Sequence, residues 1–352
     1  MSEAIIVKRG SSNSDRVMVY SRDIIINSSV WEAPQGLVNN SVYVELIGGG
    51  GFGNRYTDYA PNIRIIAGGA GGYFNNGTIE MNEGEAVYVS IGRGGFNSTG
   101  YRNGGTTSFG TYLSANGGGG GTIQRGDVTI ILGGDGGSGG GASIDELDLN
   151  GPLIGNNMFY YKAKGGIGYQ FGGGGVYVNN NAIGNFQFDA LEGGNGGPWG
   201  GGGGVYSIFN ENLTGNLMAG IGGEFGGNGG TLSMDAVNGT NTLGLTLNIY
   251  GNFCRSNGNG RCGNYGGGGG GYGGRGGNYG GGGGGYGGIG GSNGGGGGGM
   301  NYNSYGAGSA GLGVDMGVHF GEGGSYSSQN GTNGACVIYY YRWINNGEQI
   351  GI

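Results

Sequence analysis

The sequence predicts a mainly β protein in which an antiparallel β-sandwich continues into a bundle of packed polyglycine II helices, with almost no α-helix. Three observations support this prediction. Glycine supplies 104 of the 352 residues, and tracts of six glycines recur at a fixed spacing. Short apolar runs, rich in β-branched and aromatic residues, pass directly into glycine tracts. Strands and glycine segments are therefore expected to continue into one another.

The most regular glycine stretch lies between Gly263 and Gly299. Three hexaglycine tracts in this stretch are followed by Tyr272, Tyr286 and Met300, at a spacing of fourteen residues. An extended threefold helix leaves its N–H and C=O groups pointing sideways, and glycine alone allows neighbouring backbones to approach and pair. Six residues in this conformation span about 19 Å. We expect these segments to pack laterally, with Tyr272, Tyr286 and Met300 in structural roles on the surface of the bundle.

Glycine helices need a conventional core beside them. Ordering one residue costs about 1–2 kcal/mol, and glycine loses the most freedom, whereas a net hydrogen bond returns about 0.5–1.5 kcal/mol. The hydrogen bonds of glycine segments alone therefore at most offset the conformational entropy lost on ordering them. Apolar and aromatic side chains in the rest of the chain are expected to anchor the bundle.

The first 132 residues have the pattern of short strands separated by Gly, Asn and Ser. Trp31 and Pro34, to which we assign structural roles, precede the strongest run, Val42–Ile47. The expected strands are Ile5–Val7, Val17–Tyr20, Ile24–Ile26, Val42–Ile47, Ile63–Ile66, Ala86–Ile91 and Val128–Leu132.

The closing run Gly334–Trp343 is too apolar for a free tail, so we expect it to return and pair with the N-terminal sheet. This divides the chain into attachment strands, a sandwich with the first glycine helices, a polyglycine II bundle with inserted loops, and a short tail. The expected boundaries are 1–30, 31–132 completed by 334–343, 133–333, and 344–352.

Composition excludes several classes of protein. Four prolines are too few for collagen, and 24 Tyr with 12 Phe argue against simple disorder. The 22 acidic residues outnumber the 15 basic residues, for a net charge of −7, which argues against nucleic-acid binding. The N-terminus has neither a secretory signal nor a transmembrane segment. We expect no membrane insertion, synthesis in the cytoplasm, and release by lysis.

The residues do not predict an enzyme, a cofactor or a metal site. Gly-x-Gly-x-x-Gly occurs by chance in so glycine-rich a chain, no P-loop motif is present, and the single His319 makes triads improbable. Cys254 and Cys262 bracket a turn-rich loop and either form a disulfide or remain free thiols. Two cysteines and one distant histidine do not supply the four ligands of a zinc site.

Longer excursions interrupt the glycine region and are the expected contact surface, because loops on a rigid scaffold carry recognition. They are Asp145–Tyr161, Val176–Leu191, Val205–Met218 and Leu232–Arg261. Leu243–Ile249 alternates apolar and small or polar residues, as a half-buried strand does. Aromatic and asparagine side chains are the candidate receptor contacts, although each aromatic also fits a role in covering the bundle. These candidates are Trp199, Phe209, Phe253, Asn257 and Asn259.

In the order of its motifs the chain resembles the glycine-rich domain of bacteriophage tail-fibre and tail-tip proteins and of phage-tail-like bacteriocins. The residues that carry the resemblance are Trp31–Pro34, Val42–Gly51, Gly71–Tyr73, Gly105–Gly110, Leu113–Gly118 and Gly334–Tyr340. The resemblance implies a virion or tail-particle protein that binds a bacterial surface glycan or protein. It also implies contact with other tail or baseplate proteins, and self-association, for example as a trimer. A purely structural tail connector and a glycine-rich extracellular binding module remain alternatives.

Overall fold

The computed structural model shows a mainly β protein with no α-helix and one 3-10 turn, η1 (Val38–Asn40), among its described residues. No helix in this part of the chain is long and apolar enough to span a membrane. The structure describes residues 2–9, 16–58, 63–97, 100–146, 159–170, 173–180, 186–198, 202–203, 205–209, 216–218, 220–221, 231–233, 245–247, 253–255, 320–324 and 329–345.

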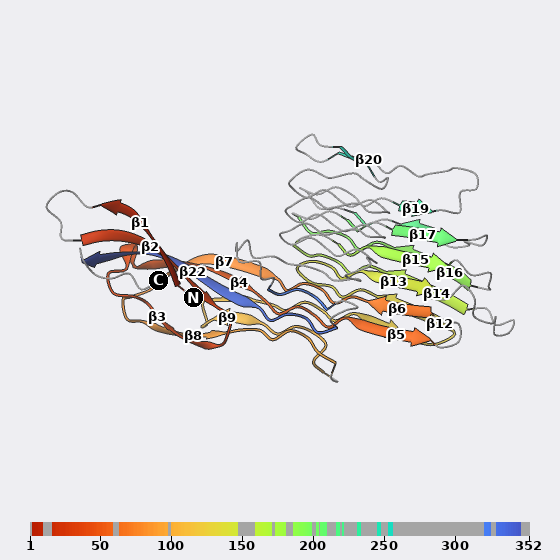
Figure 1. Cartoon of the computed structure of the whole chain (residues 1–352), viewed down its shortest axis with the longest axis horizontal. Helices are drawn as coiled ribbons and strands as arrows, with labels where there is room; N and C mark the ends of the chain where they lie inside the picture. The colour runs from red at the N-terminus through yellow and green to blue at the C-terminus, as the bar shows by residue number, and fades with distance from the viewer. Residues whose placement is uncertain are drawn as a thin grey trace.

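The molecule is elongated, with a two-layered β region at each end and glycine segments between them (Figure 1). Two antiparallel sheets form the end that holds the first and last strands, and we call this end the terminal sandwich. Sheet I has the order β1-β2-β22-β4-β7, and sheet II has the order β10-β9-β8-β3. Their bounds are β1 Ser2–Arg9, β2 Arg16–Ile25, β3 Ser29–Glu32, β4 Ser41–Ile47, β7 Phe74–Glu80, β8 Ala86–Ser90, β9 Thr107–Phe109, β10 Leu113–Ala115 and β22 Ala335–Asn345.

The return of the C-terminal strand is confirmed. Strand β22 pairs with β2 through ten residues on one side and with β4 on the other, so it lies at the centre of sheet I. The expected runs Val17–Tyr20 and Ile24–Ile26 form one strand, β2, because Ser21–Asp23 continues the same ladder. Side chains along β4 alternate between the two faces of the sheet. Val42, Val44 and Leu46 therefore point into the core, and Tyr43 and Glu45 point outward.

The core of the terminal sandwich is formed by side chains from both of its sheets. Trp31 lies in this core against Phe109 and Tyr340, at ring-centroid distances of 5.8 and 6.1 Å. Pro34 lies just beyond β3 and is half-buried. The other members include Val42, Val44, Leu46, Ile79, Val87, Val89, Cys336 and Ile338.

Two further sheets form the other end of the molecule, which we call the distal sandwich. Sheet III has the order β11-β12-β14-β16-β18, and sheet IV has the order β19-β17-β15-β13-β6-β5. Their bounds are β5 Asn54–Asp58, β6 Ile63–Ala67, β11 Thr122–Gln124, β12 Val128–Leu132, β13 Ala142–Glu146, β14 Phe159–Lys164, β15 Val176–Asn180, β16 Phe186–Glu192, β17 Val205–Phe209, β18 Asn216–Met218 and β19 Thr231–Ser233. A separate hairpin pairs β20 Leu245–Leu247 with β21 Phe253–Arg255.

The distal sandwich differs from expectation in two ways. The expected runs Ile63–Ile66 and Val128–Leu132, assigned to the first sandwich, form β6 and β12 here, and they pair with β5 and β11, which were not expected as strands. Most of its strand pairs are parallel, including β12 with β14 and β13 with β15. The physical reason is that the chain between β12 and β19 visits the two sheets alternately, so each sheet receives a strand of the same direction on every circuit. A period of two in the sequence does not distinguish parallel from antiparallel pairing.

Three glycine segments cross between the two sandwiches: residues 48–53 join β4 to β5, residues 68–73 join β6 to β7, and residues 116–121 join β10 to β11. Their backbones are hydrogen-bonded side by side although they are not assigned to strands. The Gly118 amide donates to the Gly49 carbonyl at 2.9 Å, and the Ala70 amide donates to the Gly119 carbonyl at 2.9 Å. Main-chain pairing therefore continues from one end of the molecule to the other.

One continuous zigzag of hydrogen bonds passes through the glycine segments beside the distal sandwich. It links eight glycines, which are given in order at the end of this paragraph. From the second glycine onward, each amide donates to the carbonyl of the glycine before it, with N···O distances of 2.8–2.9 Å. An added Cβ on any glycine from the third member onward would lie within 3.0 Å of a carbonyl oxygen of a neighbouring segment. Only glycine fits this spacing. The series is Gly68, Gly134, Gly140, Gly166, Gly174, Gly194, Gly203 and Gly220.

Gln170 joins the glycine segments to the terminal sandwich by imitating a strand. Its side-chain Oε1 accepts from the Phe74 amide at 2.7 Å, and its Nε2 donates to the Phe74 carbonyl at 2.6 Å. Next to it, the rings of Tyr73 and Tyr169 stack at a centroid distance of 6.1 Å. Both polar groups of Phe74 are thus satisfied by one side chain from 96 residues further along the sequence.

Gln170→Ala is expected to lower the free energy of unfolding by about 1–3 kcal/mol, because it removes two hydrogen bonds and leaves backbone groups of Phe74 unpaired. Chemical denaturation measures the change. Gln124→Ala, at an exposed position in β11, is the matched control and should be nearly neutral. Equal effects of the two substitutions would contradict this role for Gln170.

Candidate functional site

The outer face of sheet I carries a groove lined mainly by tyrosines, which we call the tyrosine groove. Residues on alternate positions of a strand point to one face, so Tyr339 and Tyr341 face outward while Tyr340, between them, faces the core. The strand register places Tyr341 opposite Tyr20 and Tyr339 opposite Tyr43. Four phenol rings from three strands therefore gather on one side of the sheet.

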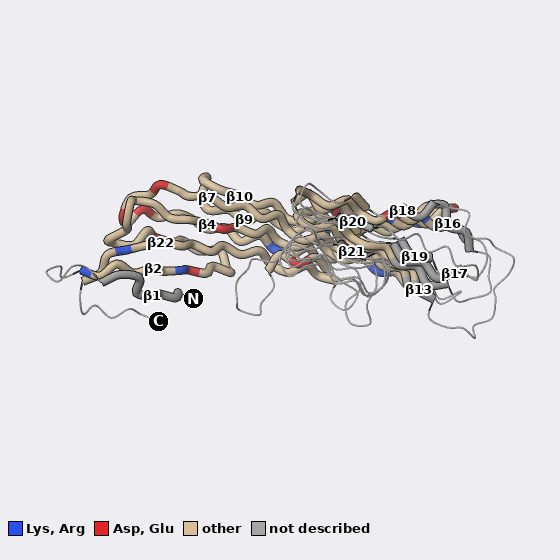
Figure 2. The backbone as a smooth tube through the Cα atoms, turned by 90° about the horizontal axis from the view of Figure 1, so that it is seen from above, with Lys and Arg blue, Asp and Glu red and all other residues tan. Residues whose placement is uncertain are grey.

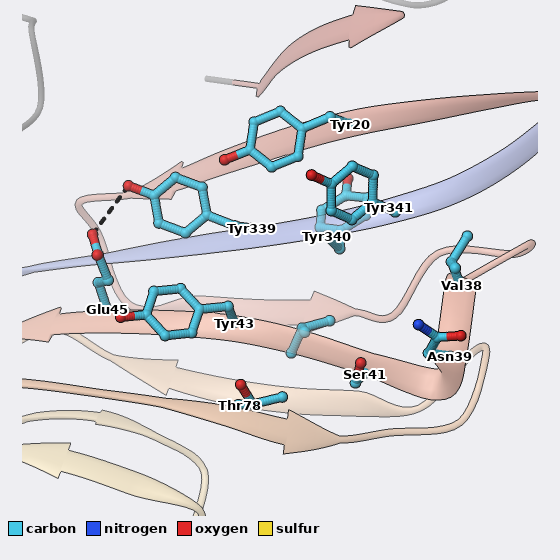
Figure 3. A pocket seen from close by; sticks show the side chains of 11 residues that line it. Tyr20, Val38, Asn39, Ser41, Tyr43, Glu45, Thr78, Tyr339, Tyr340 and Tyr341 are labelled. Carbon is cyan, nitrogen blue, oxygen red and sulfur yellow. Dashed lines mark hydrogen bonds between the residues drawn. The ribbon is translucent and has the colours of Figure 1, made fainter. Parts of the chain in front are cut away.

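The groove has a volume of about 540 Å³. The ring of Tyr339 lies 6.3 Å from that of Tyr20 and 6.0 Å from that of Tyr43, and the ring of Tyr20 lies 5.2 Å from that of Tyr341. Figure 3 shows these rings standing above β2, β22 and β4. Hydroxyl and amide groups surround them. The full lining is Tyr20, Val38, Asn39, Ser41, Val42, Tyr43, Glu45, Thr78, Tyr339, Tyr340 and Tyr341.

Glu45 is the only carboxylate among the described residues that line the groove. The Tyr339 hydroxyl donates to its Oε2 at 3.0 Å, as Figure 3 shows. Burial raises the pKa of Glu45, while the hydrogen bond from Tyr339 and the charge of Arg22 lower it by less. Burial also raises the pKa of Tyr20, Tyr43 and Tyr339, to which the negative charge of Glu45 adds. Tyr20, Tyr43 and Tyr339 therefore hold their protons more tightly, and Tyr339 is a neutral donor to one partly desolvated carboxylate.

The raised pKa of Glu45 predicts a pH dependence of stability. Because its folded pKa lies above the ordinary value of 4.5, the folded state holds this proton more tightly than the unfolded chain does. The stability is fully present below pH 4.5 and is lost as the pH rises through the folded pKa. Glu45→Gln should therefore gain stability relative to the parent protein between pH 4 and pH 7. Denaturant midpoints at both pH values measure this gain, and a difference independent of pH would contradict it.

The floor of the groove is fixed from behind by Asp23. One of its oxygens, Oδ2, accepts from Trp31 Nε1 at 2.9 Å and from the Tyr340 hydroxyl at 3.0 Å. Burial, followed by the charge and hydrogen bond of Asp23, raises the pKa of Tyr340 to about 12. The central strand is thus held to sheet II through Trp31, and the two outward tyrosines on either side of Tyr340 have a rigid base.

The receptor-contact residues suggested by the sequence are not brought together in the described part of the chain. Phe209 is the last residue of β17, and Phe253 is the first residue of β21. Cys254 lies opposite Thr246 in the β20–β21 hairpin, where part of the expected strand Leu243–Ile249 is found as β20. Trp199, Asn257, Asn259, Cys262, Tyr272, Tyr286 and Met300 lie outside the described residues, as do the three hexaglycine tracts.

The strands that bound three of the sequence excursions alternate in direction. Strands β13, β15 and β17 run away from the glycine segments, and β14, β16 and β18 run back toward them. The ends of β13, β15 and β17 and the beginnings of β14, β16 and β18 therefore lie together at the outer end of the distal sandwich, far from β1 and β22 (Figure 1).

Sequence reasoning missed the tyrosine groove. The signal was present in Tyr339–Tyr341 and in the alternation of Val42–Ile47, because outward aromatics on adjacent strands form a patch when the strands pair. The sequence predicted that β22 pairs with the N-terminal sheet, but it predicted neither the neighbouring strands nor their register. Within the described residues no cluster of three or more His, Cys, Asp or Glu is arranged to hold a metal ion.

Comparisons of the chain with protein-family models, with curated proteins and with solved structures gave no match.

Proposed function

We propose that this chain is a non-enzymatic adhesin of a bacteriophage tail fibre, tail tip or phage-tail-like bacteriocin. In this proposal the glycine segments form a polyglycine II bundle, and the distal connecting segments bind a glycan or protein on the bacterial surface. The chain would act in the virion or tail-like particle after release by lysis. Neighbouring tail or baseplate proteins, and further copies of the chain in a trimer, would be its other partners.

The polyglycine II proposal is supported by the hydrogen bonds between glycine segments. The Gly174 amide donates to Gly166, and the Gly174 carbonyl accepts from Gly194, so a single residue pairs with two neighbouring segments. A β-strand also pairs on two sides, but its side chains alternate above and below the sheet. Here an added Cβ on Gly174 would overlap the Gly140 carbonyl, so the segments are packed more closely than side chains permit.

The single observation that carries the adhesin proposal is the common location of the strand ends that segments 147–158, 181–185 and 210–215 connect. These strand ends lie at the outer end of the distal sandwich, while the strands nearest both ends of the chain lie in the terminal sandwich (Figure 1). A protein attached to a particle through the terminal sandwich would present the opposite end to a cell. Segments of different sequence on a repeated scaffold suit recognition.

Charge supports contact with a surface other than a nucleic acid. Figure 2 shows Lys, Arg, Asp and Glu at single, scattered positions along the described backbone, without a basic stripe. A phosphate-binding groove would need such a stripe.

Adsorption to cells tests the adhesin proposal. Fluorescently labelled protein at micromolar concentration should bind saturably to the host bacterium of a particle that carries it, and should compete with that particle. Replacing segments 147–158, 181–185 and 210–215 with Gly/Ser sequences of equal length should weaken binding at least about tenfold, as expected when the main contact residues of an interface are removed.

The control variant is Tyr88→Ala, which removes a side chain that is 58% exposed on sheet II at the terminal sandwich. This variant should bind cells as the parent protein does. If a folded parent protein does not adsorb, the adhesin proposal fails and the structural connector is favoured. Adsorption that is unchanged by replacement of all three segments would contradict the assignment of these segments.

A further inference from the structure

We propose that the tyrosine groove receives a lysine or arginine side chain from a neighbouring polypeptide, with Glu45 as the counter-ion and the tyrosine rings as its walls. The groove lies at the opposite end of the molecule from the distal connecting segments, so this inference goes beyond the adhesin function. It assigns the terminal sandwich a partner of stated chemistry.

The charge of the groove favours a cation. Among the described residues that line the groove, Glu45 is the one carboxylic acid and none is a Lys or Arg. The faces of tyrosine rings carry a negative quadrupole; Tyr339 donates to this carboxylate, and the rings of Tyr20 and Tyr43 lie 6.3 and 6.0 Å from that of Tyr339. A cation placed over these rings gains both a cation–π contact and an ion pair. The lining is therefore complementary to a cation.

The environment of the Glu45 carboxylate also favours a cation. Only one Glu45 oxygen accepts the Tyr339 hydroxyl, at 3.0 Å, and a carboxylate has acceptor capacity beyond one bond. Arg22 lies on the same face, opposite Tyr339 in the register, and its charge acts on Glu45. Burial still has the larger influence and raises the pKa of Glu45. A second cation from a partner would compensate this desolvation.

The extent of the exposed aromatic surface favours a polypeptide over a small amine. The aromatic surface continues beyond the groove to Trp343, which is two residues further along β22 and 39% exposed. Tyr43 and Tyr341 at the groove are 38% and 42% exposed. A single small amine would leave most of this surface in water, whereas a basic side chain with apolar neighbours covers it. Aromatic residues and Arg are enriched at the centres of protein interfaces.

The test uses three peptides that differ only in the central side chain: acetyl-Gly-Lys-Gly-amide, acetyl-Gly-Arg-Gly-amide and the norleucine analogue, which has an uncharged chain of similar length. NMR titration of the tyrosine ring signals should show saturable binding of the lysine or arginine peptide, with a Kd on the order of 1 mM, as suits one cation–π contact and one ion pair. The norleucine peptide should not bind.

Variants make the test specific. Glu45→Gln keeps an acceptor for Tyr339 and should weaken binding of the basic peptide at least tenfold. Tyr43→Leu should weaken it through loss of one wall. Tyr88→Leu, on sheet II, should bind as the parent protein does. Equal binding of the norleucine peptide, unchanged binding by folded Glu45→Gln, or the absence of saturable shifts with either basic peptide would overturn the proposal. None of these results bears on adsorption to cells.

Discussion

Gly140→Ala is expected to lower the free energy of unfolding by about 3 kcal/mol or more, the upper part of the range for an overpacked interior. The Gly140 amide donates to Gly134, and its carbonyl accepts from Gly166. An added methyl group would overlap the Gly68 carbonyl, which belongs to a backbone held on both sides and unable to move as a side chain does. Separating the segments would break several hydrogen bonds at once.

The control for this substitution is Gly126→Ala, in the turn between β11 and β12. The nearest atom to an added Cβ at Gly126 is the Val128 carbonyl oxygen at 3.7 Å, which is an ordinary contact. Chemical denaturation of both variants measures the difference. Gly126→Ala should be neutral or slightly stabilising, because alanine restricts the unfolded chain. A tolerated Gly140→Ala would show that the glycine segments are not closely packed.

Asp23→Ala is expected to cost about 2–4 kcal/mol, because two hydrogen bonds to a charged acceptor are lost and both donors lose that partner. The donors are Trp31 Nε1 and the Tyr340 hydroxyl, at 2.9 and 3.0 Å from the same oxygen. Both donors join sheet I to sheet II through aromatic side chains in the core. The loss should appear as a lower midpoint of unfolding for the terminal sandwich.

Tyrosine titration gives the Asp23 substitution a second measurement. Burial and Asp23 together raise the pKa of Tyr340 to about 12, so Asp23→Ala should lower that pKa toward its ordinary value of 10.0 without reaching it. Absorbance near the phenolate band follows the change. Asp127→Ala, at an exposed position before β12, is the control and should alter neither quantity. An unchanged Tyr340 titration in Asp23→Ala would contradict the hydrogen-bonded arrangement.

Much of the terminal sandwich was predictable from the sequence. The alternation in Val42–Ile47 predicted β4, because a period of two with one apolar face specifies a half-buried strand. The apolar run before Trp343 predicted β22 and its return to the N-terminal sheet. Register was not predictable in the same way. It depends on the pairing of strands almost 300 residues apart, and the tyrosine groove exists only in that register.

The distal sandwich was predictable only in part. The sequence indicated that the strand Val128–Leu132 passes into glycine, and the structure has this strand as β12. The circuits from β12 to β19, with parallel pairing in both sheets, were not foreseen. Their lengths vary because segments 147–158, 181–185 and 210–215 differ, and the sequence therefore lacks the fixed period by which such repeats are found.

The two ends of the molecule have complementary parts in the proposed function. The terminal sandwich, with its groove of Tyr20, Tyr43, Tyr339 and Tyr341, is proposed to face a protein partner. The outer end of the distal sandwich is proposed to face the cell. The hydrogen-bonded glycine segments between them connect the two ends.

Hydrogen exchange of the glycine amides is the most direct test of the central claim that lateral main-chain hydrogen bonds hold these segments together. In protein labelled with ¹⁵N-glycine, the amides of Gly134, Gly140, Gly166, Gly174 and Gly194 should exchange about 10³-fold or more slowly than in an unstructured peptide, as amides in a stable cooperative unit do. Exchange of these amides at the rate of an unstructured peptide would contradict the account.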